Sequence, residues 1–134
     1  MSSLLENMIL GIGIDLVKVD RIEKAMSRWA GAFTGRVFTE HEVLYCLKQK
    51  RPAEVFAARF AAKEAVMKAF GTGLSGGVSW KDVEVVRSDS GKPDIVLDGR
   101  LKTLASEMGV SKVFISFSHD SGFAVAQAVL TGDK

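Results

Sequence analysis

Two hydrophobic periods alternate along the chain and predict the order of its strands and helices. A period of two residues indicates a strand with one buried face, whereas a period of three to four indicates an amphipathic helix. The first predicted strand, residues 8–14, directs Leu10, Ile12 and Ile14 to one face, which we expect to form part of the core. Two glycines lie on the opposite face, which ends in the carboxylate of Asp15.

Three later segments have helical spacing. Residues 19–29 place their apolar side chains on one face and leave a basic side exposed. Thr39 followed by Glu42 has the spacing of a capping box, which predicts a short helix that ends before the next proline. The longest helix is predicted over residues 53–70, and it ends where Gly71 can serve as a C-terminal cap.

The rest of the chain predicts a hairpin, one more helix and two more strands. In chain order we expect a glycine-rich loop at 71–77, strands at 82–87 and 94–97, a helix at 99–108, and strands at 112–118 and 122–130. Because strands and helices do not alternate regularly, this order favours an α+β fold, a single compact domain of mixed helices and antiparallel strands. We assign the domain to residues 8–131 and treat residues 1–7 as an N-terminal extension without a function.

Composition narrows the class of protein without choosing a function. At 134 residues, 47% of them hydrophobic and 25% charged, the chain fits one water-soluble globular domain. The net charge of +2 is too small to indicate a nucleic-acid partner, although residues 16–51 carry eight basic and four acidic side chains, a local +4. Cys46 has no second cysteine with which to form a disulfide. With no signal sequence and no membrane-spanning run, we expect a cytosolic protein.

The long helix combines a core-facing arc with a separate charged pair. The arc consists of Phe56, Phe60, Met67 and Phe70. Glu64 and Lys68 lie one turn apart on a different face, beside two alanines that would let a ligand or another backbone come close. Such a pair is also what an ordinary solvent-exposed helix carries, where it contributes only about 0.2–0.5 kcal/mol. Asp15 likewise has two interpretations, as the cap of the next helix or as a partner of Glu64 in binding a hard divalent cation.

The glycine-rich loop after the long helix favours a phosphate ligand. Gly71-Thr72-Gly73 and Ser75-Gly76-Gly77 offer unhindered backbone N–H groups of the kind that hold phosphates. The residues by themselves therefore indicate an α+β phosphate-binding domain, with or without a metal.

Four motifs together resemble a known family. They are Gly11-Ile12-Gly13-Ile14-Asp15-Leu16, the run Arg59-Phe60-Ala61-Ala62-Lys63-Glu64-Ala65 continued by Lys68-Ala69-Phe70-Gly71-Thr72-Gly73, the turn Gly91-Lys92-Pro93, and Ile115-Ser116-Phe117-Ser118-His119. In order and spacing, from Met8 to about Leu130, the chain resembles the short holo-acyl-carrier-protein synthase group of 4′-phosphopantetheinyl transferases.

The resemblance implies a reaction and a set of catalytic residues. It implies transfer of 4′-phosphopantetheine from coenzyme A to a serine of apo acyl carrier protein, in fatty acid biosynthesis and lipid metabolism, with adenosine 3′,5′-bisphosphate as the other product. Asp15 and Glu64 would bind Mg²⁺ at the two bridging phosphates, and Lys68 would contact the same pyrophosphate. Glu64, Asp15 or a metal-bound water could take the serine proton.

The same resemblance implies binding residues and an assembly. Those carried over for coenzyme A are Arg59, Lys68, Gly71, Gly73, Lys92, Pro93, Ser118 and His119. For Arg59 and His119 a purely structural role is the alternative, and turn chemistry explains Pro93 equally well. The family also forms homotrimers with active sites between neighbouring subunits.

The basic side of the first helix is the expected docking surface for acyl carrier protein. Arg21, Lys24 and Arg28 lie along one side, while Met26 and Trp29 anchor the helix with Ile22. A solvated helix face is the alternative. Two other functions compete, a non-catalytic nucleotide- or coenzyme-A-binding module and a small RNA-binding protein suggested by a pI near 8.8.

Overall fold

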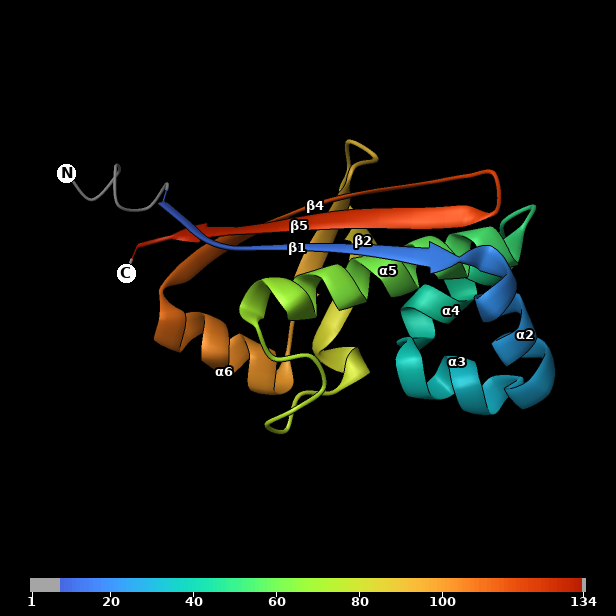
Figure 1. Cartoon of the computed structure of the whole chain (residues 1–134), viewed down its shortest axis with the longest axis horizontal. Coiled ribbons are helices and arrows are strands. Elements are labelled where there is room, and N and C mark those ends of the chain that lie inside the picture. The colour runs from blue at the N-terminus through green and yellow to red at the C-terminus, as the bar shows by residue number, and fades with distance from the viewer. Residues whose placement is uncertain (1–7, 134) are drawn as a thin grey trace.

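The computed structural model describes residues 8–133 and confirms the α+β fold (Figure 1). Its elements are β1 (Met8–Lys18), α2 (Val19–Trp29), α3 (Gly31–Val37), α4 (Glu40–Leu47), α5 (Pro52–Phe70), the 3₁₀ turn η1 (Trp80–Asp82), β2 (Val83–Arg87), β3 (Pro93–Leu97), α6 (Gly99–Met108), β4 (Val110–Asp120) and β5 (Phe123–Gly132). Residues 1–7, predicted to be an extension, lie outside the described residues, and the boundary at 8–131 stays a prediction.

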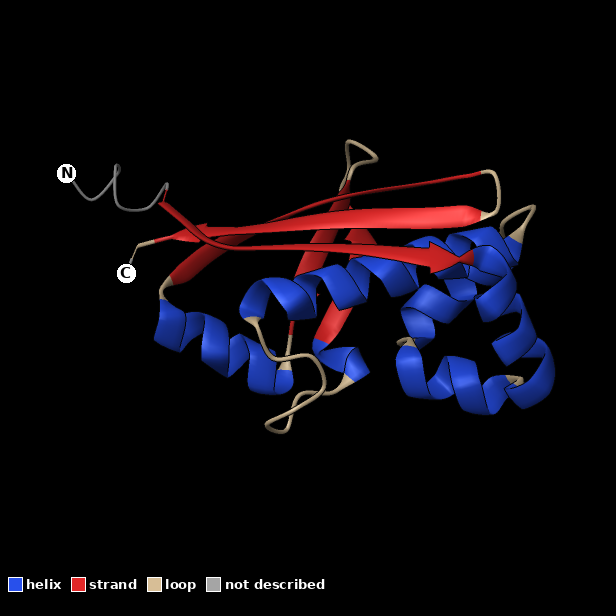
Figure 2. Ribbon diagram, in the orientation of Figure 1, coloured by secondary structure: helices blue, strands red, loops and turns tan. Residues whose placement is uncertain are grey.

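The strands form one three-stranded sheet and one separate hairpin. In the sheet the order is β1-β5-β4, and both pairs are antiparallel. β2 and β3 pair only with each other. Figures 1 and 2 show the helices beneath one face of the sheet, with α5 directly under it, α6 towards one end and α2, α3 and α4 towards the other.

Helix α5 is the centre of the domain because it is buried on nearly all sides. Of its last eight residues only Glu64 and Lys68 escape full burial. The predicted aromatic arc is buried, with Phe56 at 0% and Phe60 at 5% exposure. Gly71 ends the helix in the left-handed region at φ 79°, as predicted.

Strand β1 lies so close to α5 that only glycine fits at two positions. A Cβ at Gly13 would lie 1.9 Å from the carbonyl oxygen of Ala65, and one at Gly11 would lie 2.2 Å from that of Ala69. The glycine face of β1 is therefore the packed face, joining the sheet to the central helix without side chains between them.

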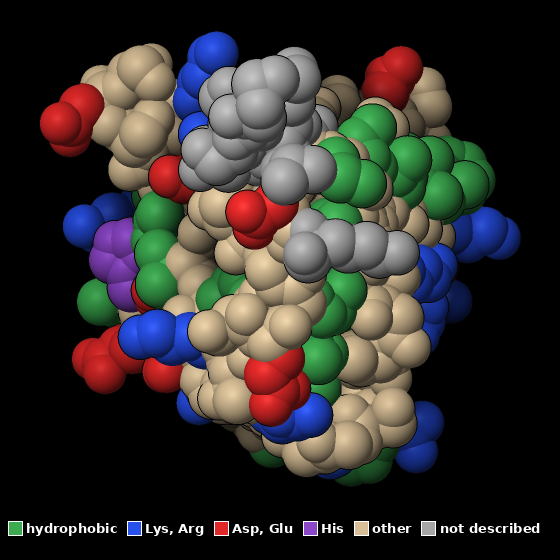
Figure 3. Space-filling view, turned by 90° about the vertical axis from the view of Figure 1, so that its left-hand side faces the viewer, with side chains coloured by type: hydrophobic (Ala, Val, Ile, Leu, Met, Phe, Trp, Pro, Cys, Tyr) green, Lys and Arg blue, Asp and Glu red, His purple; other side chains and the backbone are tan. Residues whose placement is uncertain are grey.

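The prediction that Leu10, Ile12 and Ile14 face the core was wrong for the two isoleucines, since Ile12 is 58% exposed and Ile14 is 62% exposed. Leu10 is half-buried and packs against the core, at a bulge where the register between β1 and β5 shifts. From Gly11 onward the side chains alternate as predicted, but the glycines mark the side where another backbone approaches, so Ile12 and Ile14 point away from α5. Figure 3, seen from the end of the molecule where β1 begins and β5 ends, shows hydrophobic side chains at the surface.

The sequence analysis also missed one helix and misplaced several ends. Helix α3 spans only seven residues, two of them glycine, which is too short for a period to be read. Strand β1 continues to Lys18 rather than ending at residue 14, and Asp82 belongs to η1 rather than to β2. The capping box of Thr39 and Glu42 is present as predicted. No helix among residues 8–133 is long and apolar enough to cross a membrane.

The close packing of β1 on α5 predicts a strong position dependence of glycine substitutions. Gly13→Ala should lower the free energy of unfolding by about 3 kcal/mol, because the new methyl group overlaps a backbone carbonyl that cannot move away. Gly35→Ala is the matched control, since this glycine lies in α3 with nothing within 4 Å, and it should be neutral or stabilising by about 0.5–1 kcal/mol. Urea unfolding measures both, and equal stabilities would contradict the packing.

Candidate active site

The first cluster of predicted site residues lies where β1 passes α5. Asp15 Oδ1 accepts a hydrogen bond from Lys68 Nζ at 2.9 Å, and the same ammonium donates to the carbonyl oxygen of Ile14 at 3.1 Å. The Asp15 side chain is 11% exposed and that of Lys68 is 50% exposed. The structure therefore brings together a carboxylate and a cation that are 53 residues apart in the sequence.

The two carboxylates of this cluster fit a divalent cation. Asp15 Oδ2 is buried and has no hydrogen-bond partner among residues 8–133, an arrangement that costs free energy unless a ligand completes it. Burial raises the pKa of the Glu64 carboxyl, and the neighbouring charge of Asp15 raises it further, against smaller opposing effects of Lys68 and Arg21. Two carboxylates that repel each other around an unsatisfied oxygen are what a hard cation such as Mg²⁺ would neutralise. Residues 8–133 contain no group of three or more potential protein ligands, so further ligands would have to come from substrate and water.

The glycine-rich loop begins one turn beyond Lys68. Gly71 and Gly73 both have positive φ, at 79° and 54°, and a Cβ at either would meet nothing within 4 Å. Thr72 N bonds back to Met67, and Ser75 Oγ donates to the carbonyl oxygen of Thr72 at 2.6 Å. The loop thus presents open backbone beyond the C-terminal end of α5.

A second cluster surrounds the ring of Tyr45. The guanidinium carbon of Arg59 lies 4.4 Å from the ring centroid, and that of Arg87 lies 5.3 Å from it. Phe117 of β4 also contacts Arg59, at 5.6 Å. These side chains line a cavity of about 390 Å³ together with Ser118 and His119. Two guanidinium groups beside an aromatic ring form a cationic pocket suited to a phosphate and a flat ring.

The other predicted nucleotide residues lie around this pocket. His119 Nδ1 is 3.0 Å from Glu54 at the start of α5, and the histidine side chain is 43% exposed. Ser118 is exposed on β4. Lys92 and Pro93 lie at the tip of the β2–β3 hairpin, whose turn Arg87 closes by donating to the carbonyl oxygen of Gly91 at 2.7 Å.

The two clusters lie on opposite flanks of α5. Asp15 and Phe117 both pair with Ala126 of β5, one from each side, so a whole strand separates them in the sheet. On α5 itself Arg59 and Glu64 are five residues apart, which turns them about 140° from each other. Residues predicted to hold one ligand are thus divided by the helix within a single chain.

Comparison with known proteins identifies the family. Residues 11–128 match the family model of the 4′-phosphopantetheinyl transferase superfamily. The chain belongs to this superfamily. It is 47% identical over 123 residues to a holo-[acyl-carrier-protein] synthase of Geotalea daltonii, covering 92% of this chain and 98% of that protein.

Solved structures agree with the assignment to the transferase superfamily. A holo-[acyl-carrier-protein] synthase from Neisseria meningitidis superposes with a TM-score of 0.85 at 36% identity, covering 92% of this chain and 98% of that one. A synthase from Helicobacter pylori, solved in complex with coenzyme A, gives a TM-score of 0.80 at 32% identity over 90% of this chain and 99% of that one. The resemblance found in the four motifs is confirmed.

In this transferase the predicted docking residues lie along α2 and are largely exposed. Lys24 pairs with Asp20 at 3.0 Å, and the Arg21 guanidinium lies 5.8 Å from the ring of Phe60. Arg28 lies over the ring of Trp29, at 5.0 Å. The prediction that Trp29 anchors the helix was wrong, because its side chain is 56% exposed; the tryptophan ends α2 and belongs to the surface.

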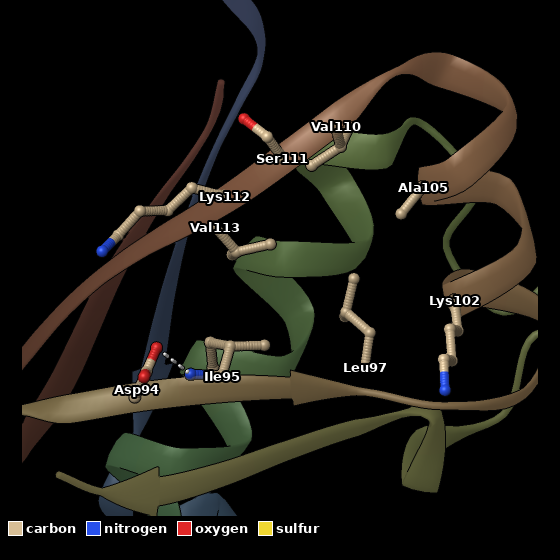
Figure 4. A pocket seen from close by; sticks show the side chains of 9 residues that line it. All are labelled: Asp94, Ile95, Leu97, Lys102, Ala105, Val110, Ser111, Lys112 and Val113. Atoms are coloured by element: carbon tan, nitrogen blue, oxygen red, sulfur yellow. Dashed lines mark hydrogen bonds between the residues drawn. The ribbon is translucent and has the colours of Figure 1, made fainter. Parts of the chain in front are cut away.

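Sequence reasoning missed Tyr45 and Arg87 as site residues. Neither lies in a motif, and only the folded hairpin brings them together, so the one available signal was an exposed arginine at a strand end. A different cavity of about 420 Å³, between β3, α6 and β4, contains none of the predicted site residues (Figure 4). Its charged lining consists of Asp94, Lys102 and Lys112, all at its exposed rim.

The raised pKa of Glu64 predicts that this carboxylate costs stability at neutral pH. The folded state holds its proton more tightly than the unfolded chain, so stability falls as pH rises from the unfolded pKa through the folded one. Glu64→Gln should therefore unfold at a higher urea concentration than wild type at pH 7.5 in chelator, and the two midpoints should converge at about pH 4. A variant that is less stable at pH 7.5 would contradict this.

Proposed function

We propose that this protein transfers 4′-phosphopantetheine from coenzyme A to a serine hydroxyl of apo acyl carrier protein and releases adenosine 3′,5′-bisphosphate. The observation that carries the proposal is the buried Asp15 Oδ2, which has no partner among the described residues, beside Glu64 and Lys68. The family and the named relatives agree with this chemistry. The reaction would belong to fatty acid biosynthesis and lipid metabolism, in the cytosol.

Asp15 and Glu64 would hold Mg²⁺, and the bound ion would neutralise the oxygens of the pyrophosphate bridge. Lys68 places a second cation at the same bridge, where it offsets the charge that develops on the leaving phosphate. The backbone of Gly71 and Gly73 leaves room for these phosphates. A carboxylate of the pair, or a water that it holds, accepts the proton of the attacking serine.

The cavity around Tyr45 would hold the nucleotide end of coenzyme A. Arg59 and Arg87 offer two permanent cations to its 3′-phosphate, and His119 offers a third hydrogen-bonding group. Ser118 lines the same cavity from β4. Lys92 and Pro93 are not among its lining residues, but they lie at the tip of the hairpin that carries Arg87. A non-catalytic coenzyme-A-binding module would need this pocket but not the Asp15 cluster.

A homotrimer with active sites between subunits accounts for the division of the site by α5. The exposed face of the sheet is apolar, with five residues of β1, β4 and β5 at 38–64% exposure, namely Ile12, Ile14, Leu16, Phe114 and Val125. A patch of this kind is typical of an interface between subunits. Packed there, the pyrophosphate residues of one subunit would face the nucleotide pocket of the next.

The acidic carrier protein would dock on α2. Arg21, Lys24 and Arg28 give this helix a positive side at one end of the molecule, and Trp29 adds an exposed apolar surface beside them. Such a surface attracts an acidic partner over a long range and is screened by salt.

Mass spectrometry of apo acyl carrier protein incubated with coenzyme A, Mg²⁺ and this protein tests the function. We expect a phosphopantetheine adduct, its loss in excess chelator, and a decrease of at least about 100-fold in rate for Asp15→Asn and Glu64→Gln. Wild-type rates in chelator would contradict the metal, and a wild type without adduct would contradict the transfer.

Mixing two inactive variants tests the shared site. Asp15→Asn removes the metal half of the site, and Arg59→Ala with His119→Ala removes the nucleotide half. If neighbouring subunits complete each other, trimers formed by refolding the two together should recover about a quarter of wild-type activity, because random assembly gives some interfaces both intact halves. Activity no higher than that of the separate variants would show that each chain works alone.

A further inference from the structure

A buried ion pair lies outside the reaction just described. Glu42 of α4 and Lys63 of α5 are both fully buried, and their Oε1 and Nζ atoms are 2.8 Å apart. Taking two charges out of water costs free energy that their attraction returns only in part, and a hydrophobic pair of similar volume is often as stable. The free energy of folding alone therefore does not explain why a charged pair lies here. The hydrogen bonds that the pair makes to its neighbours do explain it.

The two side chains of the pair form the hydrogen bonds to β2 that a third strand beside the hairpin would form. Glu42 Oε2 accepts a hydrogen bond from the backbone N–H of Val85 at 2.7 Å, and Lys63 Nζ donates to the carbonyl oxygen of Val83. A parallel neighbouring strand would bond to these same two groups, on either side of Glu84. Within the described part of the chain the hairpin has no other strand on this edge, and two-stranded hairpins are marginal when unsupported.

Two further hydrogen bonds join this part of the helices to η1 and β2. Lys63 Nζ donates to the carbonyl oxygen of Trp80 at 3.3 Å, just before β2, and Thr39 Oγ1 donates to Glu84 Oε2 at 2.6 Å. The backbone N–H of Thr39 in turn donates to Glu42 Oε1 at 2.8 Å. Because four of these bonds each go to one particular residue of β2 or η1, the network specifies how far along α4 and α5 the hairpin sits.

Each element tied by the pair carries one group of the nucleotide pocket. On α4, Tyr45 follows Glu42 by three residues; on α5, Arg59 precedes Lys63 by four, on nearly the same face. On β2, Arg87 follows Val85 by two residues and so points to the same side of the strand. A shift of the hairpin would move Arg87 away from the Tyr45 ring, which it now faces at 5.3 Å.

We propose that Glu42 and Lys63 are positioning residues for coenzyme A: as a substitute strand they hold the β2–β3 hairpin, and with it Arg87 and the Lys92-Pro93 turn, in register with Arg59. This rests on the proposed function for the identity of the ligand. Neither residue touches the substrate, and their effect reaches it through the position of the pocket wall.

The double variant Glu42→Gln/Lys63→Met tests this, because it removes both charges together and leaves no buried charge unpaired. We expect its melting temperature to stay within a few degrees of wild type. Its dissociation constant for adenosine 3′,5′-bisphosphate, measured by calorimetry, and its KM for coenzyme A should both rise about tenfold. The KM for carrier protein and kcat should not change, a split that a general loss of folded protein would not produce.

Two control variants test whether the loss of nucleotide affinity is specific to the buried pair. Arg100→Gln/Glu107→Gln removes an exposed ion pair of 3.5 Å on α6 and should leave the nucleotide affinity unchanged. Arg28→Glu should raise the KM for carrier protein and leave the KM for coenzyme A unchanged, which is the reverse of the result expected for Glu42→Gln/Lys63→Met.

Wild-type nucleotide affinity in a folded Glu42→Gln/Lys63→Met variant would overturn the inference. If that variant does not fold, Thr39→Val removes one bond to the same strand, together with the N-cap bond that Thr39 Oγ1 accepts from the backbone of Glu42, and should weaken nucleotide binding about threefold. Unchanged affinity there would overturn the inference as well. A wild type that binds the nucleotide but transfers nothing would instead contradict the proposed function, and the comparison of affinities would still stand.

Discussion

The contact between β1 and α5 without intervening side chains is the constraint on which the rest of the structure depends. At Gly13 the strand backbone approaches the carbonyl of Ala65 to a distance that no other residue permits. Two residues further along the same face, Asp15 is therefore held against the helix at the level of Glu64 and Lys68. The position of the Asp15 carboxylate thus depends on the lack of a side chain at Gly13.

The same contact explains the exposed apolar face of the sheet. Side chains alternate along a strand, so committing the glycines of β1 to α5 sends Ile12, Ile14 and Leu16 to the opposite side. In an isolated chain this exposure is unfavourable. It is accounted for if another copy covers the sheet, so the assembly proposed above and the position of Asp15 both follow from the same packing of β1 on α5.

What could be predicted from the sequence was whatever depends on local geometry. The capping box at Thr39, the left-handed Gly71 and the end of α5 follow from bonds within a few residues, and they are present. The face of β1 was assigned wrongly because hydrophobicity was taken to mean burial, whereas the two glycines marked the packed side. Tyr45, Arg87 and the Glu42–Lys63 pair could not be predicted, since each acts through a contact between elements distant in the chain.

Burial of α5 on nearly every side divides the chemistry of the molecule. Because alanines and aromatics occupy most of its surface, each charged residue on it lies at a point where a particular neighbour arrives: β1 at Lys68, α4 and β2 at Lys63, and Tyr45 and Phe117 at Arg59. The Asp15–Lys68 cluster and the pocket around Tyr45 are thus both positioned by contacts with the same helix. A ligand long enough to need both flanks must reach around the helix or across to another subunit. A molecule with a pyrophosphate at one end and a nucleotide at the other can reach both clusters across a subunit interface without any change in α5.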